Sequence, residues 1–325
     1  MHKLSDFVDI NNTNKFIPTL KQKWDHLHNE TGVFRYKINN LQKKLIDSKY
    51  LVQLNPDRGC KRRMPEQIES ICQPFNRNEF NFTKVSPKEI IFYITDESDK
   101  HALLVNVSPL SHYHTLLCPS INKCLPQIVT LQSLQLAIEI YFIAQDRDLR
   151  IAFNSLCALA SVNHLHYHLF LEEHHLPVES VKCIHLINHI YYFNDYPIPG
   201  FCFEIPDQDS ATKITNEIYK LLEYFLKKSI AHNIFMTRGQ TIIPGSHDSK
   251  DILRIFIWPR KSSAVKQLNS LNIAACEISG WFTIYNAEDY DRLQKEDLEC
   301  ELEKCKINDF KELCNEIKHL DINIQ

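Results

Sequence analysis

The sequence is short of glycine and lacks paired cysteine motifs. Six of its 325 residues are glycine, and none of them lies between Gly59 and Gly200. The eleven cysteines are scattered and form no C-x-x-C pair, which argues against a zinc site made of cysteine pairs and against a disulfide scaffold. We therefore expect reduced thiols, as in a cytoplasmic protein.

Long apolar runs and an excess of positive charge are also missing. No apolar stretch approaches the ~20 residues of a bilayer-spanning helix, and the N-terminal residues lack the apolar region of a signal peptide. Lysine and arginine number 37 against 40 aspartates and glutamates, a formal net charge of -3. Because nucleic-acid binders usually carry a basic excess, we expect neither a nucleic-acid nor a membrane partner.

The sequence does contain the hydrophobic patterning of a mixed fold. Apolar residues recur at helical spacing in 130–146 and 210–228, and residues 1–50 also read as mostly helical. Shorter apolar or alternating runs predict strands at 89–95, 101–107, 115–118, 164–171, 201–205, 234–237 and 253–258. Helices and strands do not alternate regularly, as they would in a doubly wound fold. We predict an α+β fold, an antiparallel sheet with flanking helices.

Three histidines at alternate positions form the most specific signal in the sequence. They stand in the segment NHLHYHL and are His164, His166 and His168. Alternate residues of a strand share one face, so we expect the three imidazoles on one side of a strand. The apolar residues between them, Leu165 and Tyr167, would then point into the other layer.

Three interpretations of this cluster compete. An H-x-H pair on a strand suits zinc, but no carboxylate at ligand spacing supports a metal site, and we predict none. Histidines exposed on a sheet face are a second interpretation, which the apolar alternation weakens. In the third, a neutral imidazole attacks phosphorus near pH 7 and splits one displacement into two steps. The flanking rings can then donate hydrogen bonds to phosphate oxygens, which makes the central His166 our candidate nucleophile.

The sequence around the cluster resembles the GDP-D-glucose phosphorylase family of the histidine-triad superfamily, and its plant relative GDP-L-galactose phosphorylase. The matching segments span nearly the whole chain in order, at 32–36, 51–55, 61–63, 73–84, 105–110, 153–168, 231–239 and 255–261. The resemblance implies a transfer of GMP from GDP-glucose to inorganic phosphate, without a cofactor, through a guanylylated histidine. The products are GDP and glucose 1-phosphate.

The resemblance also implies roles for individual residues. His166 takes the GMP, His164 orients His166, and His168 contacts phosphate oxygens or the leaving group. Six further residues are candidate substrate contacts, each with a structural alternative as a turn, a cap, an exposed side chain or core packing. They are Ser161, Asn154, His114, Lys84, Phe82 and Arg238.

Several places that hold glycine in the family hold larger residues in this sequence. They are Tyr113, Ala152, Cys157, Ala158 and Leu169. Glycine lets a backbone approach a phosphate closely or adopt a positive φ, so these changes could narrow the site or weaken turnover. Two alternatives therefore stay open, an inactive guanine-nucleotide-binding paralogue and a nucleotide-sugar hydrolase that releases GMP. The chemical groups are all kept, and we favour activity.

For the organisation of the chain we predict three parts. Residues 1–55 form an N-terminal helical extension, 56–200 a catalytic histidine-triad-like half, and 201–325 a degenerate second half packed on the first. The sequence shows no clean internal repeat. It leaves open a homodimer and the identity of the preferred hexose.

Overall fold

The computed structural model describes residues 2–7, 14–30, 32–39, 41–95, 99–242, 252–263 and 271–320. The strands are β1 (Gln42–Ile46), β2 (Tyr50–Leu54), β3 (Ile90–Thr95), β4 (Lys100–Val105), β5 (Thr115–Cys118), β6 (Leu149–Asn154), β7 (Tyr167–Leu171), β8 (Ile184–Ile187), β9 (Ile190–Phe193), β10 (Gly200–Ile205), β11 (Ala231–Gly239), β12 (Ile252–Arg260) and β13 (Trp281–Ile284). The helices are α1 (Phe16–Asn29), α2 (Pro56–Lys61), α3 (Leu131–Ala144), α4 (Gln208–Lys227), α5 (Ala275–Ser279), α6 (Ala287–Arg292), α7 (Lys295–Lys304) and α8 (Phe310–Lys318).

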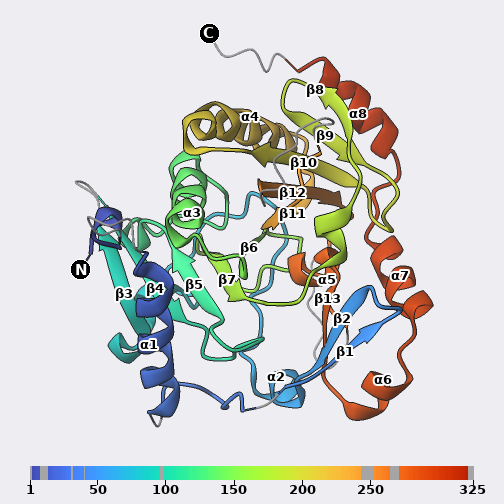
Figure 1. The fold of residues 1–325 in the computed structure, drawn as a ribbon. Helices are drawn as coiled ribbons and strands as arrows, with labels where there is room; N and C mark the ends of the chain where they lie inside the picture. The colour runs from blue at the N-terminus through green and yellow to red at the C-terminus, as the bar shows by residue number, and fades with distance from the viewer. Residues whose placement is uncertain are drawn as a thin grey trace.

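A ten-stranded antiparallel sheet forms the centre of the molecule (Figure 1). Its strand order is β3-β4-β5-β7-β6-β11-β12-β10-β9-β8. The first repeat (β3, β4, β5, α3, β6, β7) and the second repeat (β8, β9, β10, α4, β11, β12) have the same order of elements and the same strand order from edge to centre. They join where β6 pairs with β11, with Asn154 opposite Asn233. The fold is therefore built of two topologically equivalent repeats, although the sequence shows no clean repeat.

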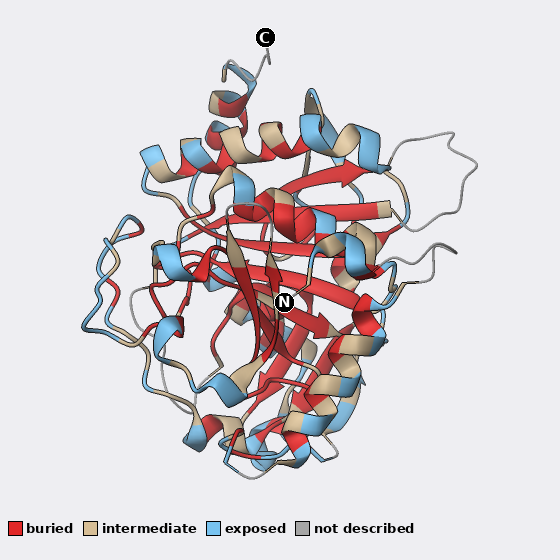
Figure 2. Cartoon of the chain, turned by 90° about the vertical axis from the view of Figure 1, so that its left-hand side faces the viewer, coloured by how far each residue is buried: buried red, intermediate tan, exposed pale blue. Residues whose placement is uncertain are grey.

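Different layers cover the two faces of this sheet. Helices α1, α3, α4 and α8 contribute to a core on one face, which Leu165, Tyr167 and Leu169 join from the sheet side. On the other face, a small sheet of order β1-β2-β13 packs together with α5 against Phe235 and Trp258 of the large sheet. Figure 2 shows most of the strands of the large sheet buried and the helices buried on one side only. The sheet is therefore the middle layer of the protein.

The sequence predicted most of these elements. The two long helices form as α3 and α4, and the runs at 89–95 and 101–107 form the hairpin of β3 and β4. The α+β fold class is confirmed. The prediction of a mostly helical 1–50 is wrong in part, because β1 lies there and pairs with β2, which begins at Tyr50 and pairs in turn with the distant β13. The domain limits stay a prediction; the sheet runs unbroken through both repeats, and the second repeat begins with β8.

Local sequence explains where the main helices begin and how the strands approach each other. Thr130 caps α3 through a reciprocal bond with Ser133, and Asp207 caps α4. Gly200 opens β10 directly against Trp258, and a Cβ at this position would lie 2.7 Å from the indole. Glycine is needed here because of that close approach.

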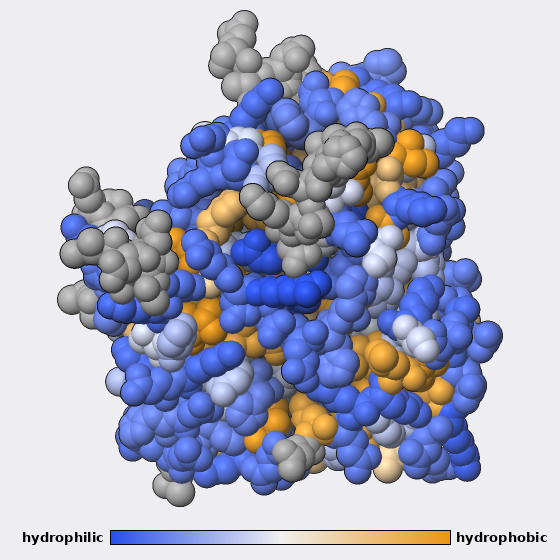
Figure 3. Space-filling view, viewed as in Figure 1, coloured by the Kyte–Doolittle hydropathy of each residue, from blue (hydrophilic) through white to orange (hydrophobic). Residues whose placement is uncertain are grey.

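The surface of the described residues is largely hydrophilic. On the face shown in Figure 3, hydrophobic side chains form separate patches between hydrophilic ones. The exposed large hydrophobic residues are Leu45, Met64 and Ile184. Among the described helices, none has the length and apolar character that crossing a membrane requires.

Candidate active site

The three histidines gather on the sheet face opposite α3 and α4. His168 lies in β7 opposite Ala152, whose side chain belongs to the core on that face. The predicted strand at 164–171 starts only at Tyr167, so His166 precedes the strand and His164 lies in a bend. The extended-strand prediction is thus wrong for two of the three, yet the rings of His166 and His168 still lie together. The centroids of the His166 and His168 rings are 5.1 Å apart.

Hydrogen bonds fix the tautomer and the position of His166. Its Nδ1 lies 2.7 Å from the carbonyl oxygen of His164, and because a carbonyl can only accept, Nδ1 carries the proton. The lone pair is then on Nε2, the atom that can attack an electrophile. The buried Gln127 holds the backbone of the same residue, accepting from its N–H at 2.8 Å and donating to its carbonyl at 3.0 Å. The candidate nucleophile is therefore pre-positioned.

A chain of hydrogen bonds also fixes the tautomer of His168. The backbone N–H of Leu110 donates to Nδ1 of His114 at 2.9 Å, so the proton of neutral His114 is on Nε2. That Nε2–H donates to Nδ1 of His168, also at 2.9 Å. The proton of His168 is consequently on its Nε2, where it can be donated to a ligand. His114 therefore fixes the tautomer of His168.

His164 has a different environment from its two neighbours. It is fully buried, and its Nδ1 accepts from the backbone N–H of Phe82 at 3.1 Å. Burial lowers its pKa to about 4, against the smaller opposing effect of the Ile121 carbonyl. The ring is therefore neutral near pH 7 and braces the segment that carries the aromatic ring of Phe82, which lies 5.0 Å from the His166 ring.

Two adjoining hollows open beside these rings. One, which we call the apolar hollow, lies beside His166, and its apolar walls are Met64, Pro65, Phe82, Val107, Leu116 and Val162. The polar hollow lies on the side of His114, and its walls include Asn154, Asn272, Glu277 and Tyr285. Among the described residues, four line both hollows: Arg58, Asn106, Ser161 and His168. We call these four the junction residues.

The structure brings most of the predicted site residues together. Ser161 and His168 are junction residues, Phe82 lines the apolar hollow, and His114 and Asn154 line the polar one. The Oδ1 of Asn154 also accepts from the Asn233 side chain at 2.6 Å and from a backbone N–H of α5 at 3.0 Å.

Two predicted substrate contacts lie elsewhere. Lys84 is exposed, and its ammonium group donates to the carbonyls of Asn78 and Glu79, which tie down their own loop. Arg238 lies over the ring of Tyr141 in α3, at 4.8 Å from its centroid, on the helix-covered face of the sheet. Neither residue lines either of the two hollows.

Several residues of the site were missed at the level of sequence. Arg58, Asn106, Gln127 and Glu277 come from four separate segments, and no spacing links them to the histidines. The basic run 61–63 was the nearest signal, since Arg62 and Arg63 line the apolar hollow. Tertiary structure alone brings these groups to the cluster.

Four of the five residues expected in place of a family glycine fall into two groups. Tyr113 and Cys157 have φ values of 58° and 60°, in the left-handed region that favours glycine. Ala152 and Leu169 lie within the paired strands β6 and β7, where any residue fits the backbone. The side chain is thus strained on the backbone at Tyr113 and Cys157 and only adds bulk at Ala152 and Leu169.

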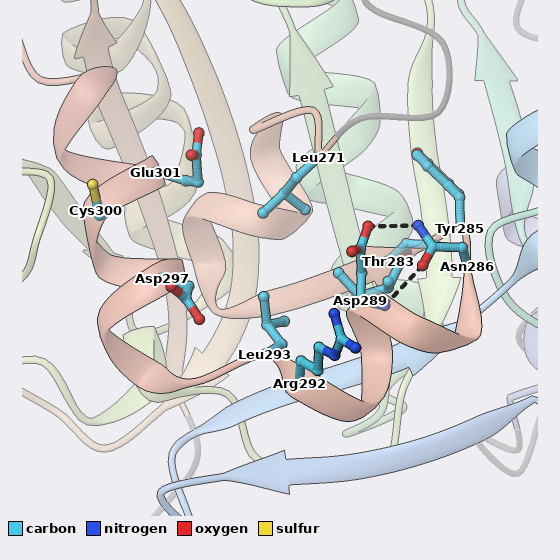
Figure 4. Close-up of a pocket in the computed structure, with 11 residues that line it drawn as sticks. Leu271, Thr283, Tyr285, Asn286, Asp289, Arg292, Leu293, Asp297, Cys300 and Glu301 are labelled. Carbon is cyan, nitrogen blue, oxygen red and sulfur yellow. Dashed lines mark hydrogen bonds between the residues drawn. The ribbon is translucent and has the colours of Figure 1, made fainter.

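A further pocket lies away from the histidines (Figure 4). Its volume is about 350 Å³, and it lies between β13, α6 and α7. Three carboxylates line it, those of Asp289, Asp297 and Glu301, and its arginine, Arg292, pairs with Glu288. Carboxylates repel phosphate groups, so the charge of its walls disfavours a nucleotide in this pocket. Among the described residues, no group of histidine, cysteine and carboxylate side chains is arranged to hold a metal ion.

The repeated sheet and the histidine cluster at its centre define a histidine-triad fold. Solved structures with the same fold include yeast Ap4A phosphorylase Apa2, which superposes with a TM-score of 0.62 at 15% sequence identity over 89% of this chain and 95% of that one. Apa2 in complex with Ap4A gives a TM-score of 0.61.

Sequence comparison identifies the family. Residues 15–170 match the family described as "GDPGP1-like, N-terminal domain", and residues 173–321 match "GDPGP1-like, C-terminal domain". The chain belongs to this family. It is 36% identical over 300 residues to GDP-D-glucose phosphorylase 1 of Danio rerio, covering 89% of this chain and 86% of the relative. Against the Homo sapiens protein of the same name, identity is 34% over 86% of this chain and 76% of the relative. Identity to GDP-L-galactose phosphorylase 2 of Arabidopsis thaliana is 27%, over 82% and 67%.

Proposed function

We propose that this chain is a GDP-hexose phosphorylase that transfers GMP from GDP-glucose to inorganic phosphate through His166. The relatives named GDP-D-glucose phosphorylase 1 support the substrate pair. The observation that carries the proposal for this chain is the tautomer of His166. Its Nδ1–H is held by a carbonyl, so the attacking lone pair is on Nε2, beside two hollows that meet.

The first step of the proposed cycle is attack on the α-phosphorus. Nε2 of His166 forms a bond to phosphorus, and the bond from that phosphorus to the bridging oxygen breaks with its electron pair on the oxygen. Glucose 1-phosphate leaves. The Nε2–H of His168 donates to the oxygen on which charge develops, which lowers the barrier.

The second step reverses the first with a new acceptor. An oxygen of inorganic phosphate attacks the α-phosphorus, the bond to Nε2 breaks, and GDP forms. The guanine lies in the apolar hollow, against the ring of Phe82, because aromatic faces stack with bases. The hexose lies in the polar hollow, whose Asn272 and Glu277 offer hydrogen-bond partners for hydroxyl groups.

The experiment measures both phosphate dependence and the covalent intermediate. Purified protein is mixed with GDP-glucose, with and without phosphate, and product formation is followed together with the intact mass. We expect a phosphate-dependent release of GDP and a mass increase of one guanylyl group. The His166→Ala variant loses both, with turnover reduced by at least about 10⁴-fold. The matched control is His185→Ala, which removes an exposed histidine of the edge strand β8 and keeps full activity.

The outcomes separate this proposal from its two alternatives. Equal rates with and without phosphate, and GMP as the product, would mean a hydrolase. Nucleotide binding without any adduct would mean a non-catalytic binding protein. An adduct on His166→Ala would refute the nucleophile.

A cytoplasmic location and a homodimer remain part of the proposal. All eleven cysteines are free, which fits a reducing compartment. Fluorescent tagging tests the location, and sedimentation of the purified chain tests the dimer.

A further inference from the structure

The junction residues surround the place where the two hollows meet. If the guanine and the hexose take one hollow each, then the phosphates that join them must lie at this junction. Ser161, Asn106 and His168 offer neutral donors there, whereas Arg58 carries a full positive charge. Of the three arginines that line these hollows, it is the one that lines both.

The fold holds the Arg58 guanidinium firmly in place. Asn55 caps α2 by accepting from the backbone N–H of Arg58 at 3.2 Å, which fixes the start of the side chain. At the far end, Nη1 donates to the carbonyl of Ser108, on the segment that leads to His114. The hydroxyls of Tyr36 and Tyr285 also hydrogen-bond to this guanidinium. A side chain ordered before binding loses little entropy when an anion arrives.

The charges around Arg58 keep it protonated without neutralising it through an ion pair. Burial opposes the charge, but the neighbouring tyrosines and Glu277 raise its pKa above the ordinary value. Its Nε is buried and has no hydrogen-bond acceptor within the described part of the chain. A buried donor left in this state costs free energy, and a phosphate oxygen would satisfy it.

The other two arginines are placed differently. Arg63 lies over the ring of Phe80 at the rim of the apolar hollow, 3.0 Å from its centroid. Arg62 lies over the ring of Tyr285, at 5.4 Å, and lines the same hollow. Neither lines the polar hollow, so neither reaches the side from which the acceptor enters.

Tyr285 connects this region to the rest of the molecule. Its ring forms part of the wall of the carboxylate-lined pocket, and Figure 4 shows its hydroxyl turned away from Asp289 and Arg292. The hydroxyl oxygen accepts from Arg58 and Arg62 instead. It therefore orients two guanidinium groups at the edge of the junction.

We infer that Arg58, oriented by the hydroxyl of Tyr285, forms the subsite of the acceptor phosphate. The inference rests on the proposed function. The phosphate of glucose 1-phosphate occupies this subsite in the first step and leaves it, and inorganic phosphate then enters the same place. Arg58 binds two oxygens of the dianion and leaves a third oxygen directed at the phosphorus on His166. Bond formation to that oxygen accompanies cleavage of the bond to Nε2, and GDP carries the former acceptor as its β-phosphate.

The test isolates the second step. The protein is loaded with GDP-glucose in the absence of phosphate, the sugar phosphate is removed by rapid desalting, and loss of the guanylyl adduct is followed by intact mass over a range of phosphate concentrations. For Arg58→Gln and Arg58→Lys we expect the phosphate concentration at half-maximal rate to rise at least about 10-fold. For Tyr285→Phe we expect a rise of about 3-fold. The slow loss of adduct to water stays unchanged, since it needs no phosphate subsite.

The matched control is Arg35→Gln. Arg35 is exposed and also donates from its guanidinium to a backbone carbonyl, that of Lys61, but it lines neither hollow. We expect the Arg35→Gln variant to keep the phosphate dependence of the unmodified chain. Thermal unfolding of each variant checks the fold, and Tyr285→Phe, which removes one oxygen, provides the reading if Arg58→Gln does not fold.

The failures of the two proposals are distinguishable. If the unmodified chain forms no adduct, or loses it at a rate independent of phosphate, the proposed function is wrong. If the unmodified chain shows phosphate-dependent loss and the folded Arg58 and Tyr285 variants match it, only the acceptor subsite is wrong. A rise in the half-maximal GDP-glucose concentration alone would place Arg58 on the nucleotide and would also overturn the inference.

Discussion

The two repeats share one topology but use the same sheet face in opposite ways. In the second repeat, this face carries Phe193, Phe256 and Trp258, which are fully buried under the small sheet and α5. In the first repeat, the corresponding face carries His168 and the hollows beside it. In the second repeat this face is filled with aromatic side chains, whereas in the first repeat it leaves room for the two hollows.

This difference shows how a repeated fold can separate stability from chemistry. The covering layer of β1, β2 and β13 ends where the hollows begin, and Tyr285, directly after β13, forms a wall on both sides of that limit. The packed repeat then supplies the rigid support that a pre-positioned nucleophile needs. Substitutions in the second repeat should therefore cost stability, and those in the first should cost turnover.

The largest effect is expected on stability, when a large side chain is removed from the packed face of the second repeat. Trp258→Ala removes a fully buried indole that stacks on Phe256, and we expect the free energy of unfolding to fall by about 3–5 kcal/mol. Denaturant titration measures this loss. Turnover per folded molecule should stay within about 3-fold of the unmodified chain. The graded control Trp258→Phe keeps most of the packing and should cost less than half as much; an alanine variant that stays stable but inactive would break the comparison.

Acid should destabilise both repeats through one buried histidine each. Burial lowers the pKa of His164 in the first repeat and of His232 in the second to about 4, against the ordinary 6.5. Between pH 6.5 and 4 the unfolded chain binds these protons and the folded chain does not, so the free energy of unfolding falls as the pH drops through this window. Each ring contributes on the order of 3 kcal/mol across the whole window.

Two variants separate these contributions. His164→Asn and His232→Asn should each flatten the pH dependence of unfolding by about one proton, measured by denaturant titration at several pH values. Only His164→Asn should also reduce turnover, because it alone supports the site. Unchanged slopes in both variants would show that neither ring is held neutral.

The next effect concerns the chain of hydrogen bonds in the open face. His114→Asn breaks the donation that fixes the tautomer of His168, and we expect turnover to fall about 100-fold. The control is His101→Asn, which changes a buried histidine of the first repeat that also accepts from a backbone N–H, that of Ser120, but lies outside both hollows. Equal turnover in the two variants would remove His114 from the mechanism.

The sequence predicted the parts of this structure that depend on local pattern. The alternation of Leu165 and Tyr167 with the histidines correctly indicated which side chains enter the helix-side core, even though β7 starts later than expected. Ser161 and Phe82 line the apolar hollow, and their contact with substrate stays a prediction. Such features depend on a few neighbouring residues, so the sequence alone can predict them.

What the sequence could not predict depends on contacts between distant segments. Lys84 and Arg238 have the right charge for phosphate, but the loop carbonyls and the ring of Tyr141 hold them elsewhere. Arg58 reaches the junction only because α2 follows β2, whose place is set by pairing with β13 more than 200 residues later. The charge of a residue makes it a candidate phosphate contact, but the tertiary structure determines whether it lies at the site.

The smallest effect returns to the shortage of glycine, and it should be equal in the two repeats. The helix of each repeat ends at an exposed residue in the left-handed region, Gln145 after α3 with φ of 45° and Ser229 after α4 with φ of 55°. A side chain there costs roughly 1–2 kcal/mol, part of which is offset by the greater freedom of glycine in the unfolded chain. Gln145→Gly and Ser229→Gly should therefore each raise the free energy of unfolding by about 0.5–1 kcal/mol, additively in the double variant because the sites are independent. Denaturant titration measures the gain, and turnover should not change. A stabilisation confined to one helix would show that the two repeats, alike in topology, do not end their helices under the same strain.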